Sequence, residues 1–300
     1  MRKPIVVGSD PRNPADSPPI LFGAAVARLT GAPLIVACVE AGSPVLPIYA
    51  GSTLPYAIVH DDLVGDCSSA VEQIDAEMRA AGVPVDTRTL RSTSAARALH
   101  ELAEEEHAAL LVVGATTRTG ADRAVGGSTS VSLLHSAPCP VAVVPPEHRT
   151  PERFATIGVA YVASDEGRLA LRNAHALARR AGATLRVITV VKGGDDGGAL
   201  RGTDREAAER ELGAAAELGD DVRVDVQVLS GDTAETLSRA SQELDLLVCG
   251  SRGYGPLRSV ILGSVSRRVA VEAHCPVVVV PRGVETSLEE LGQEVAAATA

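Results

Sequence analysis

Two glycine-rich segments, one in each half of the chain, carry the residues best suited to chemistry. In the later segment Gly250 and Gly253 are followed, after nine intervening residues, by Gly263, Ser264 and Ser266. Glycine has no Cβ and adopts positive φ easily, so such a loop lets backbone N–H groups approach a bulky ligand. Serines that open a helix add hydroxyl groups where the helix dipole favours an anion. The spacing indicates a phosphate site, and the alternative is a tight strand exit with an ordinary serine N-cap.

The earlier segment matches the later one except at one point. Thr117 stands where the later segment has its second glycine, and its branched side chain would narrow the loop. Asp10, after the first β-rich run, offers a carboxylate to a base or ribose, or else caps a turn before Pro11. The second half has Val162 at that place, so each half lacks one feature that the other keeps. The matching residues of the earlier segment are Gly114, Gly127, Ser128, Thr129 and Ser130.

Both segments belong to an internal repeat. Residues 110–145 and 246–281 align without gaps and share 14 of 36 positions. Upstream, the run that contains Gly8 matches the run that contains Gly158. A proline-rich stretch between the two copies is typical of a short linker. We therefore expect two copies of one unit, at residues 1–147 and 152–283, followed by a tail at 284–300.

Within each copy, short β-rich runs alternate with helical patterns. Near-continuous apolar strands separated by helices are typical of a parallel sheet covered on both faces. We expect two α/β domains, each a doubly wound, Rossmann-like parallel sheet of five strands. Such sheets bind ligands beyond the carboxyl ends of their strands. The expected strands begin near residues 5, 34, 85, 110 and 141, and near 157, 185, 222, 246 and 277.

Composition narrows the classes of protein that fit. With 28 Lys and Arg against 38 Asp and Glu, the net charge of −10 has the wrong sign for holding nucleic acid or an anionic membrane. Aromatic residues form only 2% of the chain, too few for base-stacking platforms. No stretch is apolar for long enough to span a bilayer, and the start lacks the apolar stretch of a secretion signal. We expect a cytoplasmic protein without nucleic-acid or membrane partners.

The residues of reactive type show no catalytic pattern. The five cysteines form no C-x-x-C pair and are too few to cross-link a chain of this length, so reduced thiols are expected. Cys139 and Cys275 are equivalent in the repeat, and we expect both to be structural. The seven histidines lack metal-ligand spacing, and there is no Walker loop, G-x-S-x-G elbow or H-E-x-x-H. We therefore assign no catalytic and no metal-binding residues.

The spacing G-x2-G-x9-G-S resembles the nucleotide-binding motif of the universal stress protein family. The chain is similar to a tandem member of that family from Pro4 to Pro281. The resemblance implies the fold that this family shares with the adenine nucleotide alpha hydrolases, and ATP as ligand, with or without Mg²⁺. It also implies that Asp10 lies at the adenine or ribose, and that Val39 and Val190 meet adenine through their backbones. The residues implied for the ribose and phosphates of the second site are Gly250, Gly253, Gly263, Ser264, Val265 and Ser266.

These features together favour an ATP-binding regulatory protein of the cellular stress response. Two alternatives remain open, a nucleotide-free scaffold that acts through protein partners and a slow ATP hydrolase. Because family members pair through their last strand, the runs at 141–144 and 277–280 are expected to meet inside the chain as a pseudo-twofold sandwich. Whether two chains then form a homodimer, and which proteins they bind, stays open.

Overall fold

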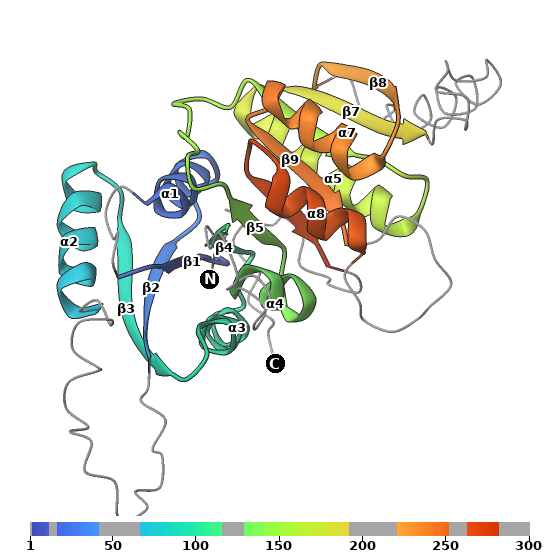
Figure 1. Cartoon of the computed structure of the whole chain (residues 1–300). Coiled ribbons are helices and arrows are strands. Elements are labelled where there is room, and N and C mark those ends of the chain that lie inside the picture. The colour runs from blue at the N-terminus through green and yellow to red at the C-terminus, as the bar shows by residue number, and fades with distance from the viewer. Residues whose placement is uncertain are drawn as a thin grey trace, which may run out of the picture.

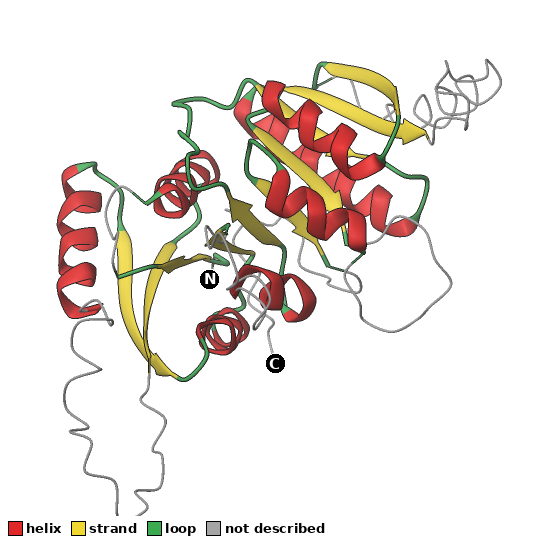
Figure 2. Cartoon of the chain, in the orientation of Figure 1, coloured by secondary structure: helices red, strands yellow, loops and turns green. Residues whose placement is uncertain are grey.

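The computed structural model describes residues 2–11, 17–41, 67–115, 129–191, 221–251 and 263–281. Strands and helices alternate through both halves (Figures 1 and 2). The first half contains β1 (Ile5–Ser9), α1 (Pro18–Thr30), β2 (Leu34–Ala41), α2 (Cys67–Ala80), β3 (Val85–Ser92), α3 (Ala95–Glu105), β4 (Leu110–Gly114), α4 (Thr129–Ser136) and β5 (Val141–Val144). The second half contains β6 (Thr156–Ala160), α5 (Asp165–Ala181), β7 (Thr184–Val191), β8 (Val224–Ser230), α7 (Thr233–Ala240), the short 3-10 helix η2 (Ser241–Glu243), β9 (Leu246–Gly250), α8 (Ser264–Glu272) and β10 (Val277–Val280).

The strands of the described residues form one sheet in the order β3-β2-β1-β4-β5-β10-β9-β6-β7-β8. Neighbouring strands are parallel within each half, while β5 and β10 pair antiparallel, with Val141 beside Val279 and Val143 beside Val277. The predicted α/β fold and the predicted meeting of the last strands are both confirmed. The expected sandwich is wrong, because hydrogen bonding between two edge strands joins the halves side by side (Figure 2).

The pairing of strands defines which residues of the two halves are equivalent. Ile5 of β1 lies beside Leu34, and Ile157 of β6 lies beside Leu185, the repeat counterpart of Leu34. The other neighbours agree, because Ile5 lies beside the first residue of β4 and Ile157 beside the first residue of β9. β1 and β6 are therefore matched with Ile5 equivalent to Ile157.

This equivalence agrees with the match of the two runs in the sequence. Counting from the isoleucines, Gly8 is equivalent to Ala160, and Gly158 lies two residues earlier along its strand. In each strand the glycine makes room for a leucine of the layer that covers this face, at a different point along the strand. The same count makes Asp10 equivalent to Val162, as the sequence predicted.

Two apolar cores, one on each face of the sheet, run across both halves. On one face the core includes α1, α2 and α5, and on the other it includes α3, α4, α7 and α8. Phe22 of α1 lies near the centre of the first core, with its ring 6.1 Å from that of Phe154 and 6.5 Å from that of His148. His148 and Phe154 both lie in residues 145–155, which link β5 to β6, so this linker is packed into the core that the halves share.

The helix ends follow from local chemistry. Ser94, Ser164 and Asp232 precede α3, α5 and α7, and each side chain accepts a hydrogen bond from an N–H group of the first turn. Gly31 and Gly182 end α1 and α5 at φ of 69° and 62°, in the left-handed region that glycine adopts without strain.

A disulfide joins Cys38 of β2 to Cys67, the first residue of α2. The sequence analysis expected reduced thiols, and this pair departs from that expectation because the fold places two cysteines that lie 29 residues apart in contact. Cys139, Cys249 and Cys275 are free and buried. In the described part of the chain, no helix is long and apolar enough to cross a membrane.

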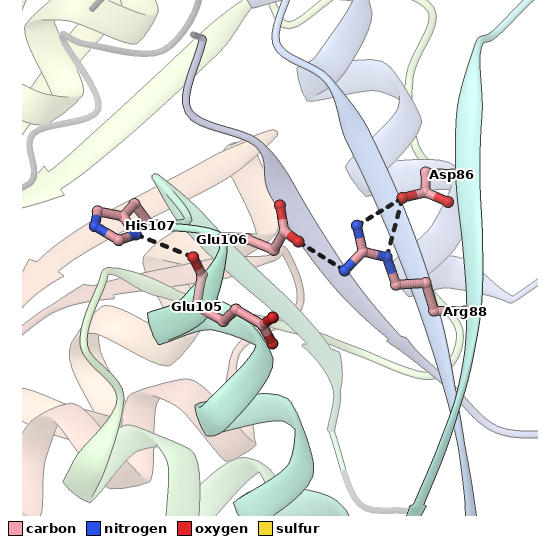
Figure 3. A network of polar contacts seen from close by, with 5 residues as sticks. All are labelled: Asp86, Arg88, Glu105, Glu106 and His107. Atoms are coloured by element: carbon pink, nitrogen blue, oxygen red, sulfur yellow. Dashed lines mark hydrogen bonds and ion pairs between the residues drawn. The ribbon is translucent and has the colours of Figure 1, made fainter.

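At each outer edge of the sheet, one arginine contacts two carboxylates, one on the edge strand and one at the end of a neighbouring helix. In the first half Arg88 of β3 contacts Asp86 at 2.8 Å and Glu106, after α3, at 2.6 Å (Figure 3). The next residue, His107, has a backbone φ of 52°. Its side-chain Nδ1 lies 3.1 Å from the carbonyl oxygen of Glu105 (Figure 3). The cluster holds the edge strand β3 against the end of α3.

The second half builds the same kind of cluster with an arginine from a different strand. Arg186 of β7 contacts Asp225 of β8 at 3.0 Å and Glu243 of η2 at 2.9 Å. Asp225 is equivalent to Asp86, whereas the first-half counterpart of Arg186 is Ile35. The two halves thus keep the arrangement while changing the strand that supplies the cation.

Candidate functional site

The candidate sites lie where the strand order reverses in each half. In the second half the chain runs from β6 outward to β7 and β8, then returns to β9 on the other side of β6. Doubly wound sheets bind ligands at such a switch point, beyond the carboxyl ends of the strands. Gly250 ends β9 there, and its neighbour Cys249 lies beside Ala160 of β6. The first half repeats this arrangement with β1 and β4, where Gly114 ends β4.

Backbone hydrogen bonds fix where the later glycine-rich segment leaves the end of β9 and where it enters α8. The Ser251 N–H donates to the carbonyl of Val280 at 2.9 Å, and the Gly263 N–H donates to the carbonyl of Ser251 at 2.8 Å. The segment therefore starts and ends at one point, next to the end of β9. In the first half Ala115 leaves the sheet in the same way, donating to Val144 at 2.7 Å.

Ser266 fastens the start of α8 to the end of β9. Its buried hydroxyl donates to the carbonyl of Gly250 at 2.8 Å. The hydrogen of this hydroxyl is therefore engaged within the protein, which differs from the expectation that both serines would donate to a phosphate. Ser264 is exposed at the helix start and keeps the place that the sequence analysis gave it.

The first turn of α8 presents backbone N–H groups at the switch point. Gly263 is the N-cap residue and has no side chain to cap the helix. The first intrahelical bond runs from Arg267 N–H to the carbonyl of Gly263 at 3.1 Å, so the N–H groups of Ser264, Val265 and Ser266 precede the helical ladder. The helix dipole places its positive end here. This arrangement suits a small anion held by backbone groups.

The first turn of α5 packs against the same strand ends. A Cβ on Gly250 would lie 3.1 Å from the carbonyl oxygen of Glu166, so a side chain there would crowd α5. A Cβ on Gly167 would lie within 1.9 Å of the carbonyl oxygen of Val162. Ser164 caps the helix, accepting from the Gly167 N–H at 3.0 Å. Gly250 therefore serves packing between β9 and α5, a role the sequence analysis did not foresee.

This packing brings acidic residues close to the candidate site. Asp165 and Glu166 form the first turn of α5, and the Cβ of Glu166 lies 3.2 Å from the position of a Cβ on Gly250. Carboxylates at a helix start stabilise the helix but oppose an incoming phosphate. Neither residue was predicted to lie at the site. The run Ser164-Asp165-Glu166 is typical of a helix start. This signal could have placed both acidic residues beside the first turn of a helix near the site.

The expected adenine positions lie at neighbouring strand ends. In the first half Ser9 lies beside Cys38, so Asp10 and Val39 follow at adjacent ends of β1 and β2. Asp10 is exposed and Val39 is half-buried.

In the second half, Val190 occupies the position on β7 that Val39 occupies on β2. The N–H of Tyr161, just after β6, donates to the carbonyl of Ile188 at 2.8 Å. Val190 lies two residues further along β7, beside Leu229 of β8, and is half-buried. The structure thus brings Val162 and Val190 to adjacent strand ends.

Part of the first glycine-rich segment and part of the second lie outside the described residues. In the first half Thr129 opens α4, and Ser130, the counterpart of Ser266, is buried. The candidate residues outside the described part of the chain are Gly127, Ser128 and Gly253, together with the variant position Thr117.

The free cysteines of the described residues are poor nucleophiles. Burial raises the pKa of Cys249, beside Gly250, to about 12, although a hydrogen bond with Ser266 opposes the rise. Burial likewise raises the pKa of Cys139 and of Cys275 to about 12. A thiol with such a pKa carries almost no thiolate at neutral pH. Their structural role, predicted for Cys139 and Cys275, agrees with this environment.

The fold and the geometry define a tandem, doubly wound α/β protein with helix starts at both switch points. Against known proteins, the sequence model of the universal stress protein family matches residues 1–145 and again residues 153–281. The chain belongs to the universal stress protein family, as a tandem member.

Individual relatives agree with this assignment. A universal stress protein of Mycobacterium tuberculosis is 33% identical over 208 residues, which cover 65% of this chain and 70% of that protein. One from Thermus aquaticus is 36% identical over 136 residues, covering 42% of this chain and 98% of that protein. Among solved structures, a universal stress protein from Archaeoglobus fulgidus has a TM-score of 0.66 at 19% identity, covering 93% of this chain and 96% of that one. This last likeness supports the fold.

Proposed function

We propose that the protein binds ATP at the second switch point and acts as a nucleotide-dependent regulator in the cellular stress response. In this proposal the N–H groups of residues 263–266 hold the phosphates and the backbone of Val190 meets adenine. Gly253 completes the glycine spacing of the site. A regulator of this kind would change its contacts with protein partners when ATP is bound, because a ligand that binds one state better shifts the population toward it.

The observation that carries the proposal is the start of α8. Gly263 leaves the helix without a side-chain cap, and the Ser266–Gly250 bond holds the first turn at the end of β9. Backbone donors held rigidly at a helix start form an anion site without a basic surface. This agrees with a chain whose net charge is −10.

The first switch point is the weaker of the two proposed sites. It keeps Asp10, Val39, Gly114, Gly127, Ser128, Thr129 and Ser130, but Thr117 replaces the second glycine of the motif. Backbone contacts to phosphate depend on the path of the chain, whereas one lost side-chain hydrogen bond, as at Val162, costs only about 1 to 3 kcal/mol. We therefore expect the second site to fill first.

Calorimetric titration with ATP tests the proposal with a matched pair of variants. Gly263→Asp places a carboxylate at the start of α8, and Gly127→Asp makes the equivalent change in the first half. We expect Gly263→Asp to abolish most of the binding heat and Gly127→Asp to leave most of it. Binding heat that Gly263→Asp leaves unchanged would contradict the assignment to the second half.

A nucleotide-free scaffold is the competing function, and one observation favours it. The backbone and Cβ of Glu166 pack against Gly250, so an acidic residue stands next to the proposed phosphate position. Ion-exchange analysis of the supernatant from denatured, freshly purified protein separates the two functions. ATP or ADP in a molar ratio near one excludes the scaffold, and its absence together with a silent titration supports it.

Several expectations stay predictions under this proposal. They are the cytoplasmic location, a homodimer, the identity of protein partners, slow ATP hydrolysis and a role for Mg²⁺. In the described part of the chain, no cluster of three or more His, Cys, Asp or Glu residues is placed to hold a metal ion.

A further inference from the structure

A cavity lies at the seam between the two halves, away from both candidate nucleotide sites. Its volume is about 490 Å³, and its walls are α1, the linker from Thr150 to Phe154 and the end of α5. Small-molecule sites commonly have volumes of this size. None of the residues that line the cavity belongs to either candidate nucleotide site.

One part of the cavity wall is apolar. Leu21, Ala25 and Leu29 are four residues apart along α1, so their side chains lie on one face of that helix. Phe154 of the linker and Ala181 of α5 complete this surface. Each half of the protein and the linker thus contribute to one apolar wall.

The other part of the wall is cationic. Arg28, Arg153 and Arg180 line the cavity against a single carboxylate, that of Glu152. The lining therefore carries three positive charges and one negative charge, a net of +2, in a chain whose net charge is −10. A local positive field in an acidic protein attracts anions to that place.

Three polar groups of the wall have unused capacity for a ligand. Within the described residues, Arg28 and Arg153 make no ion pair and no side-chain hydrogen bond, although both are exposed beside the cavity. The hydroxyl of Thr150 is shielded from solvent and has no hydrogen-bond partner there. Buried polar atoms without a partner are uncommon in folded proteins. Guanidinium groups over an apolar surface recognise a molecule with an anionic head and an apolar body.

We propose that this cavity binds a small amphipathic anion. Arg28 and Arg153 hold its carboxylate, sulfonate or phosphate group, and its apolar body lies on α1 and Phe154. Because both halves and the linker form the walls, an occupant stabilises the seam and couples the two halves. The site is independent of the ATP site proposed above.

Two fluorescent probes that differ only by a sulfonate group test this site. 8-Anilinonaphthalene-1-sulfonate is an apolar anion, and N-phenyl-1-naphthylamine is the same molecule without the sulfonate. The variants are Arg28→Gln/Arg153→Gln and, as a matched control, Arg172→Gln, an exposed arginine of α5 outside the cavity. Their thermal unfolding midpoints establish that all the proteins are folded.

We expect the wild-type protein to bind the sulfonate probe more tightly than the neutral one. The double variant should weaken binding of the sulfonate about tenfold or more while leaving the neutral probe unchanged. Arg172→Gln and saturating ATP should change neither. Equal affinity of wild type and double variant for the sulfonate would overturn the proposal, as would absence of sulfonate binding or its displacement by ATP.

Discussion

At the scale of single residues, the two serines at the start of α8 have different tasks. Ser266 is buried and donates to Gly250, whereas Ser264 is exposed at the proposed phosphate position. The sequence analysis gave both the same role, because spacing alone does not reveal which hydroxyl turns toward the strand end. The structure therefore separates a serine that fastens α8 to the end of β9 from one that is exposed at the helix start.

This difference predicts opposite effects for two alanine variants. Ser266→Ala leaves the buried carbonyl of Gly250 without its partner and should lower the free energy of unfolding by about 1 to 3 kcal/mol. Ser264→Ala removes an exposed hydroxyl and should change it by less than about 0.5 kcal/mol while weakening ATP binding. Urea unfolding and ATP titration of both variants measure this. Equal stability of the two variants would contradict the role given to Ser266.

The cysteines give a second prediction at this scale. Native protein should react slowly with Ellman's reagent at pH 8, since burial holds the pKa of Cys139, Cys249 and Cys275 at about 12. Denaturation without reductant should expose these three thiols, and added reductant should release Cys38 and Cys67 as well. Five thiols in denatured, unreduced protein would show that the disulfide does not form.

At the scale of elements, sequence patterns located the strands well because their apolar runs are nearly continuous. The run at residues 277–280, for instance, is a strand with the predicted bounds. Patterns could not place side chains that meet from distant elements. Arg88 lies on β3 and Arg186 on β7, which are not equivalent strands of the repeat. Alignment of the repeats therefore does not reveal that each arginine contacts two carboxylates at an edge of the sheet.

The edge clusters predict a stability effect that an exposed arginine lacks. Arg88→Met removes the cation between Asp86 and Glu106 and should destabilise the protein by about 1 kcal/mol, an effect that shrinks in high salt. Arg91→Met is the control, because the Arg91 side chain is 86% exposed in its pair with Glu40. Urea unfolding at two salt concentrations compares them, and equal losses from both variants would contradict the proposed importance of the cluster.

At the scale of the whole molecule, the repeat predicted two copies of one unit but not how they join. The β5–β10 pairing makes a continuous sheet, and each core extends across both halves. The sandwich expectation failed because strand sequences specify which faces are apolar, while the partner at an edge is decided by backbone hydrogen bonds. The cavity at the seam could not be predicted from the sequence either, because its walls come from three separate segments.

A shared core predicts a single cooperative unfolding transition. Scanning calorimetry should give one peak whose calorimetric and van't Hoff enthalpies agree. Val143→Pro places proline in β5 at the junction with β10 and should lower the midpoint strongly or split the transition, because proline removes a ladder hydrogen bond and fits poorly in a central strand. Two separate peaks in the wild-type protein would show that the halves unfold independently.

The central claim is that the first turn of α8 holds the phosphates of ATP. Titration of ¹⁵N-labelled protein with ATP, followed residue by residue through the backbone amide signals, tests it most directly. We expect the largest shifts at Gly263, Ser264 and Val265, with smaller ones at Thr129 and Ser130. Amide signals of α8 that stay unchanged at saturating ATP, or shifts confined to α4, would contradict it.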